Sequence, residues 1–370
     1  MKIVHVAEYA SGGVATYLRN LLKLQINDSR VDEVTLINSK LNSEKFDFDS
    51  PKFKNYTYQY ERSLSGVFKL LKLRGLIDSL NPDVVHFHSS FAGLVRLTYL
   101  FKNAKYKVVY CAHGWSFLQK DKKELYRRIY SKIELLESRK TDLIINISDD
   151  EEKEALLRGL PREKMKVVYN SISGNGTKQD IKNPYTNNKN KKLLFIGRFD
   201  KQKGLDLLLN SVNFSELNME LAVIGKPIVT NNVNRYVDSK NVKYLGWVDN
   251  KYVNSYISCC DAVVIPSLWE GFGLVALEAM KNHKMVISPD AGGLNELVLD
   301  NFNGLKFKSG SEKALSLKLK EFENMSNEEI LKLGSNGFDL FKEKYDIENL
   351  YNLLMGEFYN QVSHFRKMTK

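Results

Sequence analysis

The chain has 370 residues, 43% of them hydrophobic and 27% charged, which is the size and composition of a globular protein with two domains. Its net charge is +11, but the halves are uneven: residues 96–140 alone hold 12 Lys and Arg against 4 Asp and Glu, a balance of +8. No run of about 18 apolar residues occurs, and the N-terminus lacks a signal-peptide core, so we expect a cytoplasmic protein without membrane spans. Three cysteines, none in a C-x-x-C pair, argue against a structural zinc site.

Five apolar, β-branched runs predict strands in the first half, at residues 2–7, 33–38, 83–87, 107–111 and 142–147. Helical patterns lie between them, and Gly12-Gly13 precede the first amphipathic helix. Such alternation predicts a parallel sheet covered by helices on both faces.

Histidines close two of these strands. His86 and His88 alternate with Phe87 and therefore share one face of a strand end, where we expect a structural role. The helical H-x-x-x-H spacing and nearby carboxylates of a metal site are missing, so we expect no metal. His113, beside Gly114 directly after the next strand, is the histidine that we expect to be functional.

The basic segment contains a second helical pattern. Leu125, Ile129, Ile133 and Leu136 recur at helical spacing among Lys and Arg, as in helices that lie on anionic membranes. Two interpretations stay open, peripheral docking of residues 96–140 on the inner face of the cell membrane and a solvated helix packed on its own sheet.

The alternation breaks once, at the polar residues 171–192, which we interpret as a linker. Five further apolar runs predict strands at residues 192–197, 219–225, 242–246, 261–266 and 284–288. We therefore expect Rossmann-like domains at residues 1–170 and 193–354, and a C-terminal helix, about 355–370, that packs back on the first domain. Two such domains facing each other would place their ligand sites in the cleft between them.

The second domain opens with the motif "GRFDKQKG". Arg198 and Lys203 lie just past its first strand, where a planar fork and a mobile ammonium can together neutralise a diphosphate without a metal. The alternative is that both are ordinary solvated loop cations.

The motif "WEGFGLVALE" sets Gly271-Phe272-Gly273 between two acids, Glu270 and Glu278, at a strand-to-helix turn. Glycines and a helix N-terminus present N–H groups to an anion, so the turn suits a phosphate.

A dinucleotide-binding fingerprint is the rival interpretation, because Gly271-x-Gly273-x-x-Ala276 matches G-x-G-x-x-A and Asp290 ends the next strand. However, four residues separate the strand from the first glycine, and the match lies in the middle of its domain. An NAD-dependent oxidoreductase is therefore the alternative enzyme.

The series of motifs runs from the early "GG" through "VVHFHSSFAG", "AHGW", "GRFDKQKG" and "SLWEGFGLVALEAM" to "GGLNELV". The order of these motifs resembles that of glycosyltransferase family 4. Its members are retaining nucleotide-sugar transferases of the GT-B fold, and the resemblance covers nearly the whole chain. The most specific part is E-x7-E, here Glu270 to Glu278. Where the family often has P-N-G, this chain has Tyr169-Asn170-Ser171, which puts the conformation of that loop in doubt.

The resemblance implies a role for each matching residue. Arg198 and Lys203 would hold the donor diphosphate, and Glu278 would bind the ribose hydroxyls. Glu270 would face the transferred sugar. The backbone N–H groups of Phe272, Gly273 and Leu274 would contact phosphate or sugar oxygens. Gly13 would let the backbone of the first domain approach the diphosphate, and His113 would contact the sugar or stabilise charge at the reaction centre.

The resemblance also implies the reaction. A hexosyl or N-acetylhexosaminyl group would pass with retention from a UDP-sugar, in preference to a GDP-sugar, to a glycan or lipid-linked acceptor in capsule or O-antigen synthesis, without a metal cofactor. A non-catalytic nucleotide-sugar-binding protein remains an alternative. Nucleic-acid binding would explain the charge, but the chain has no aromatic-basic recognition motif and its second half is nearly balanced.

Overall fold

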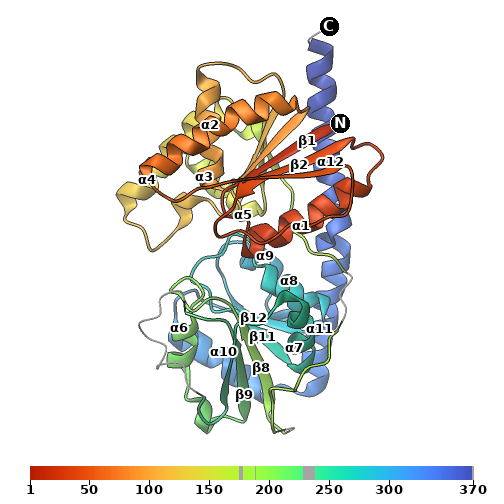
Figure 1. Cartoon of the computed structure of the whole chain (residues 1–370). Coiled ribbons are helices and arrows are strands. Elements are labelled where there is room, and N and C mark those ends of the chain that lie inside the picture. Colours follow the sequence, from red (N-terminus) through yellow and green to blue (C-terminus); the bar gives the residue numbers. More distant parts are fainter. Residues whose placement is uncertain (175–177, 188, 228–237, 369–370) are drawn as a thin grey trace. The chain divides into compact units, whose positions relative to one another are not determined.

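The computed structural model describes residues 1–174, 178–187, 189–227 and 238–368 (Figure 1). The chain divides into two compact units. The first comprises Met1–Ile172 and Ile347–Lys370, and the second comprises Ser173–Asp346. Each unit is an α/β structure built on a parallel sheet, as the alternation of strands and helices predicts.

Within its described residues, the first unit has a seven-stranded parallel sheet in the order β3-β2-β1-β4-β5-β6-β7. Its strands are β1 (Lys2–Ala7), β2 (Glu33–Ser39), β3 (Phe53–Tyr58), β4 (Val84–His88), β5 (Lys107–Cys111), β6 (Leu143–Asn146) and β7 (Met165–Val167). Its helices are α1 (Gly12–Asn27), α2 (Leu64–Leu80), α3 (Ser90–Gly93), α4 (Glu124–Ser138), α5 (Asp149–Leu157) and α12 (Ile347–Met368), with short 3-10 turns at Leu94–Leu100, Ser116–Leu118 and Arg162–Lys164.

Alternate residues of the central strands face opposite layers of the first unit. Val4 of β1 and Phe87 of β4 pack with Leu70 of α2 in the main apolar core. The opposite face of β1 and β4 includes the buried histidines His5, His86 and His88, and α1 and α12 contact each other. α12 is anchored to this unit by Tyr351, whose hydroxyl donates to Asp28 (2.6 Å). The whole of α12, from Ile347, thus belongs to the first unit.

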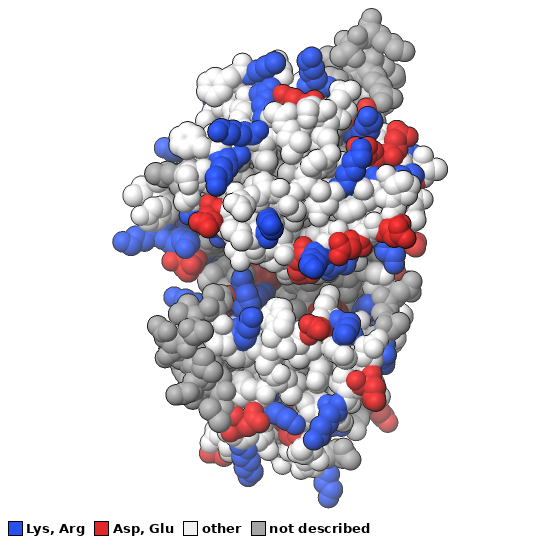
Figure 2. All heavy atoms as spheres, viewed as in Figure 1, with Lys and Arg blue, Asp and Glu red and all other residues white. Residues whose placement is uncertain are grey.

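Helix α4 has its polar face buried and its apolar face exposed. Leu125, Ile129 and Leu136 are 67%, 44% and 38% exposed, whereas Glu134 and Glu137 are buried. Such a pattern is the reverse of an ordinary surface helix. Figure 2 shows several Lys and Arg side chains on the part of the first unit that carries α2 and α4.

A buried cation explains this reversed orientation of α4. Nη2 of Arg96, which is fully buried, donates to Glu134 (2.7 Å) and Glu137 (2.5 Å), and its guanidinium lies 3.4 Å from the ring centroid of Tyr110. Burial raises the pKa of Glu137 well above its ordinary value, with the neighbouring Glu134 adding to the effect and Arg96 opposing it. Buried charges have to be paired, so the polar face of α4 turns inward and its apolar residues face outward.

Within its described residues, the second unit has a six-stranded parallel sheet in the order β10-β9-β8-β11-β12-β13. Its strands are β8 (Lys191–Ile196), β9 (Met219–Ile224), β10 (Val242–Gly246), β11 (Ala262–Val264), β12 (Met285–Pro289) and β13 (Gly304–Phe307). Its helices are α6 (Leu205–Ser211), α7 (Asn250–Cys259), α8 (Leu274–Lys281), α9 (Leu294–Leu297), α10 (Glu312–Asn324) and α11 (Asn327–Leu340), followed by a π-helical turn at Phe341–Tyr345, with a 3-10 turn at Phe214–Glu216.

All ten strands predicted from apolar runs are present, to within two residues at either end. Among the described helices, none combines the length and the apolar character that a membrane crossing requires.

Candidate active site

The candidate residues of the second unit gather where neighbouring strands of its sheet end. β8 and β11 are adjacent, so the loops that follow them leave the sheet side by side. Leu268 donates its backbone N–H to the Gln202 carbonyl (2.8 Å), and the Gln202 side chain donates to the Trp269 carbonyl (3.2 Å). These bonds hold the loop at residues 197–204 against the loop at residues 265–273.

Gly204 and Gly273 permit the close packing of these loops. Gly204 has φ +69°, and a Cβ there would lie 2.1 Å from the Pro266 carbonyl oxygen. Gly273 has φ +109°, and a Cβ there would lie 2.6 Å from the Leu294 side chain. Both positions therefore require glycine for conformation and for space. The loop after β12 joins the same group, since Gly293 donates its N–H to the Glu270 carbonyl (3.4 Å).

Lys203 and Glu270, 67 residues apart, meet at this junction. Lys203 Nζ lies 2.6 Å from Glu270 Oε2, which also accepts from Ser267 Oγ (3.2 Å). Both side chains are largely buried, at 21% and 14% exposed. Arg198 is separate from this pair: its Nη2 contacts Asp200 (3.2 Å) and Gln202 (3.2 Å), and its side chain is 54% exposed.

The remaining candidates of this unit follow in the chain. Phe272 is buried, Gly273 precedes α8, and Leu274 begins it. Glu278 lies one helical turn further along α8, and its burial raises the carboxyl pKa from 4.5 to about 7, against an opposing effect of Lys281. A carboxyl that is ready to shed its proton near neutrality is a strong hydrogen-bond acceptor once ionised.

The structure weakens the dinucleotide alternative. β11 ends at Val264, so six residues, 265–270, lie between the strand and Gly271, two more than the four expected. Asp290 is already used within the fold, because its Oδ1 accepts from the Ser309 N–H (2.7 Å).

In the first unit, Gly13 is exposed in the first turn of α1, the helix that follows β1. The N-cap residue Ser11 makes no side-chain capping bond, and the Gly12 N–H donates to Glu44 Oε1 (3.1 Å). The contact with the diphosphate that the sequence resemblance implies for Gly13 stays a prediction.

His113, two residues after the end of β5, has a conformation unusual for a residue with a side chain. Its φ is +52°, and Ser89, which follows His88, has φ +71° and ψ 157°, a region occupied almost entirely by glycine. Two strained residues at neighbouring strand ends are typical of a functional site. Burial lowers the pKa of His113 from 6.5 to about 3, so the imidazole is neutral at physiological pH.

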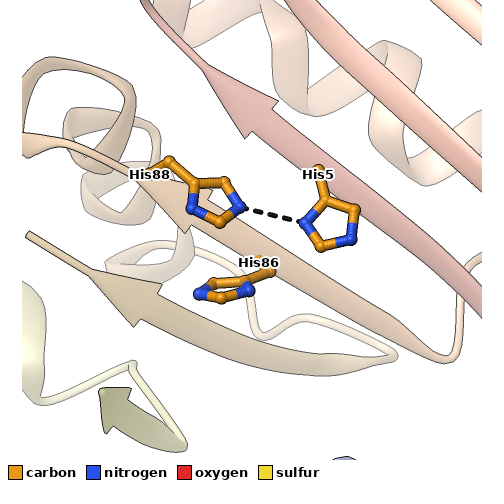
Figure 3. A group of neighbouring side chains, drawn as sticks. All are labelled: His5, His86 and His88. Atoms are coloured by element: carbon orange, nitrogen blue, oxygen red, sulfur yellow. Dashed lines mark hydrogen bonds between the residues drawn. The ribbon is translucent and has the colours of Figure 1, made fainter. Parts of the chain in front are cut away.

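Three histidines pack together beside His113, and sequence reasoning had linked only two of them. His5 of β1 lies opposite His86 of β4 in the sheet register, and His88 is two residues further along. Figure 3 shows the three rings pointing toward one another from these two strands. Each offers a ring nitrogen within 4.8 Å of the others, so the group could hold a metal ion. His5 could have been found from the sequence, because it is a polar residue inside the apolar run of β1.

Two family models match the chain. One is described as Glycosyltransferase Family 4 and covers residues 11–173, and the other is described as Glycosyl transferases group 1 and covers residues 177–339.

Known proteins resemble the chain over most of its length. It is 36% identical over 319 residues to an uncharacterized 41.2 kDa protein in the cps region of Klebsiella pneumoniae, covering 82% of this chain and 85% of that protein. It is 24% identical over 320 residues to the UDP-Gal:alpha-D-GlcNAc-diphosphoundecaprenol alpha-1,3-galactosyltransferase of Escherichia coli, covering 78% and 79%. Its fold matches that of sucrose-phosphate synthase from Thermosynechococcus elongatus, with a TM-score of 0.81 at 18% identity, over 98% of this chain and 100% of that one.

Proposed function

Because the chain belongs to glycosyltransferase family 4, with the GT-B fold and a group 1 second half, we propose that it transfers a hexosyl or N-acetylhexosaminyl group with retention from a UDP-sugar. The acceptor is a hydroxyl of a lipid-linked glycan, and the product belongs to a bacterial cell-surface polysaccharide. Relatives support this choice: one lies in a cps region, and the galactosyltransferase is named for a UDP-sugar and a diphosphoundecaprenol acceptor.

The observation that carries the proposal is the meeting of Lys203 and Glu270 at three converging loops. A nucleotide sugar has a diphosphate with hydroxyl-rich groups at either end. Lys203 and Arg198 neutralise the diphosphate, Glu270 faces the transferred sugar, and Glu278 accepts hydrogen bonds from the ribose. Backbone N–H groups of Phe272, Gly273 and Leu274 meet phosphate or sugar oxygens, and Gly13 and His113 act from the first unit.

In this mechanism the donor sugar passes through an oxocarbenium-like state. The bond between the anomeric carbon and the diphosphate oxygen breaks, and the acceptor oxygen bonds to the same face of that carbon. The departing diphosphate takes the proton of the acceptor hydroxyl, so no enzymic nucleophile is needed. The protein contributes orientation and charge stabilisation, with Lys203 and Arg198 holding the negative charge that develops on the leaving group.

Substitutions in the loop after β8 test the donor site. We expect Lys203→Ala and Arg198→Ala each to lower turnover of a UDP-sugar by about 10²–10³-fold, as for loss of a preorganised charge contact. Lys201→Ala is the matched control, because Lys201 is an exposed lysine of the same loop. Mass spectrometry with a panel of nucleotide sugars and a lipid-linked acceptor mimic measures the turnover and identifies the sugar. Near-normal turnover in both variants would contradict the proposal.

The reversed amphipathic helix α4 supports the lipid-linked acceptor. We propose that its exposed Leu125, Ile129 and Leu136 insert into the membrane surface while the surrounding Lys and Arg side chains bind anionic headgroups. The enzyme then works at the inner face of the cell membrane, where a lipid-linked acceptor presents its hydroxyl.

Vesicle flotation tests the docking of α4. At low salt we expect the protein to float with vesicles containing phosphatidylglycerol and to stay unbound with phosphatidylcholine alone. The double variant Leu125→Asp/Ile129→Asp should lose this binding. Leu157→Asp should keep it, since Leu157 is an equally exposed leucine, at 72%, on the separate helix α5. Equal binding to both kinds of vesicle would exclude recognition of the anionic surface.

A further inference from the structure

A line of hydrogen bonds leads from the interior of the first unit to His113. Gln25 Oε1 lies 2.8 Å from His5 Nε2, His5 Nδ1 lies 2.9 Å from His88 Nε2, and His88 Nδ1 lies 2.9 Å from His113 Nε2. Gln25, His5 and His88 are completely buried, whereas His113 is partly exposed. Nδ1 of His113 has no hydrogen bond among the described residues and is not one of their buried unpartnered atoms. This nitrogen is therefore open to a ligand.

The amide of Gln25 sets the direction of every bond in this line. Its Nε2 faces the Met355 sulfur (3.9 Å), a weak acceptor, so its Oε1 faces His5 and can only accept. His5 therefore carries its proton on Nε2, and its bare Nδ1 accepts from His88. By the same logic His88 carries its proton on Nε2 and accepts at Nδ1 from His113. Nδ1 of His113 is left with a lone pair.

The imidazoles of His5, His88 and His113 are neutral, so each ring carries one proton on its two nitrogens. Burial lowers the pKa of His5 to about 4 and that of His113 to about 3, and it lowers the pKa of His88 well below the ordinary value. Each neutral ring therefore has one donor and one acceptor nitrogen, and a tautomer fixed at one ring fixes its neighbour.

The cluster is better explained by this line than by a metal ion. Both ring nitrogens of His5 and of His88 are already used in hydrogen bonds, including the bond drawn in Figure 3. A metal bound to the cluster at these nitrogens would have to break that bond, because a ligating nitrogen needs its lone pair for the metal. His86, whose two ring nitrogens have no hydrogen-bond partner among the described residues, takes no part in the line.

We propose that Gln25, His5 and His88 are positioning residues that hold His113 in the tautomer with a proton on Nε2, so that Nδ1 accepts a hydrogen bond from a hydroxyl of the transferred sugar. The assignment rests on the function proposed above. In this tautomer His113 accepts a hydrogen bond from a sugar hydroxyl. It does not donate one to the diphosphate, because a ring nitrogen without a proton repels an anionic oxygen. The interior of the first unit thus determines how the enzyme recognises its sugar.

Nitrogen NMR of the full chain labelled with ¹⁵N-histidine tests the line without any substrate. Protonated and bare ring nitrogens have well-separated shifts, and His113→Gln assigns the signal. We expect a proton on Nε2 of His113 in the native protein and in Gln25→Glu, which keeps an oxygen acceptor. Gln25→Leu should mix or invert the tautomers. A proton on Nδ1 of His113 in the native protein would overturn the proposal, and so would one bound Zn²⁺ per chain by elemental analysis. Both measurements use the native protein, so they test the proposal even if Gln25→Leu fails to fold.

Kinetics then test the consequence for the sugar. Gln25→Leu should lower kcat/KM for the UDP-sugar roughly 3- to 10-fold, the value of about one hydrogen bond, and leave the Kd for UDP unchanged because UDP has no transferred sugar. Gln25→Glu, unlike Gln25→Leu, should keep kcat/KM near the native value. Equal losses in both variants would show a merely structural role. If the native protein turns over no nucleotide sugar, the proposed function fails, whereas the tautomer result stands or falls on the spectrum alone.

Discussion

Glu278 should make donor binding depend on pH in the neutral range. Its pKa is raised to about 7 by burial, and the proposed contact with ribose hydroxyls requires the ionised carboxylate as acceptor. With that pKa, roughly 90% of the carboxyl is ionised at pH 8 and roughly 10% at pH 6. We therefore expect the affinity for UDP to fall about tenfold between pH 8 and pH 6.

The matched variant is Glu278→Gln, which keeps the shape and removes the titration. Loss of hydrogen bonds to a charged acceptor is worth about 1.5–3 kcal/mol, so UDP should bind roughly 10- to 150-fold more weakly at pH 8. Isothermal titration at pH 6, 7 and 8 measures both proteins, and the difference removes the titration of UDP itself. An identical pH slope in the two proteins would refute the role of Glu278.

The same residue affects stability in the opposite direction. Because the folded pKa lies above the usual 4.5, the folded protein retains a proton that the unfolded chain has released between pH 4.5 and 7. The free energy of unfolding therefore falls as pH rises through this range, by at most about 3 kcal/mol for a pKa of about 7. Glu278→Gln should remove this loss and be the more stable protein at pH 8, although it binds UDP less well.

Two further substitutions test the packing that positions the sites. Arg96→Met should lower the free energy of unfolding, measured in urea, by about 3–5 kcal/mol, because two buried glutamates of α4 lose their cation. Adding Glu137→Gln to this variant should recover part of the lost stability. A loss below about 1 kcal/mol in Arg96→Met would contradict this explanation. Gly204→Ala should weaken UDP binding at least tenfold in titration, because the new Cβ would meet the Pro266 carbonyl. Gly246→Ala is the control: Gly246 has nearly the same φ but open space around it, so this variant should bind UDP normally. Equal effects of the two substitutions would show that backbone strain, and not the contact with Pro266, weakens binding.

Much of the fold followed from short-range patterns. Strands buried on both faces, such as β1 and β9, are nearly continuous apolar runs, so all ten predicted strands were recognisable. Three described strands, β3, β7 and β13, were not among the ten predicted. β3 lies at the edge of its sheet with exposed residues, and β7 and β13 are only three and four residues long.

The site was predictable to the extent that it depends on strand ends. Lys203 and Glu270 follow strands that proved to be neighbours, so their meeting agrees with the expected position. The line from Gln25 to His113 was beyond such reasoning. It depends on β1 lying beside β4, which places His5 against His86, and on a sulfur atom from α12. The sequence pattern of α4 could not tell which of its faces is exposed, because that depends on the buried Arg96.

The position of α12 in the first unit has a consequence for synthesis. On the ribosome, Met1–Ile172 emerge before the second unit, but the helix that covers Gln25 and His86 is made only after it. At about 5–20 residues per second, the intervening Ser173–Asp346 take roughly 10–35 s to translate. The second unit is therefore complete before the first, although it begins later. Until α12 is made, the nascent chain carries an unfinished layer of the first unit with its histidines uncovered, and a chain that stops short of residue 347 leaves that layer open permanently.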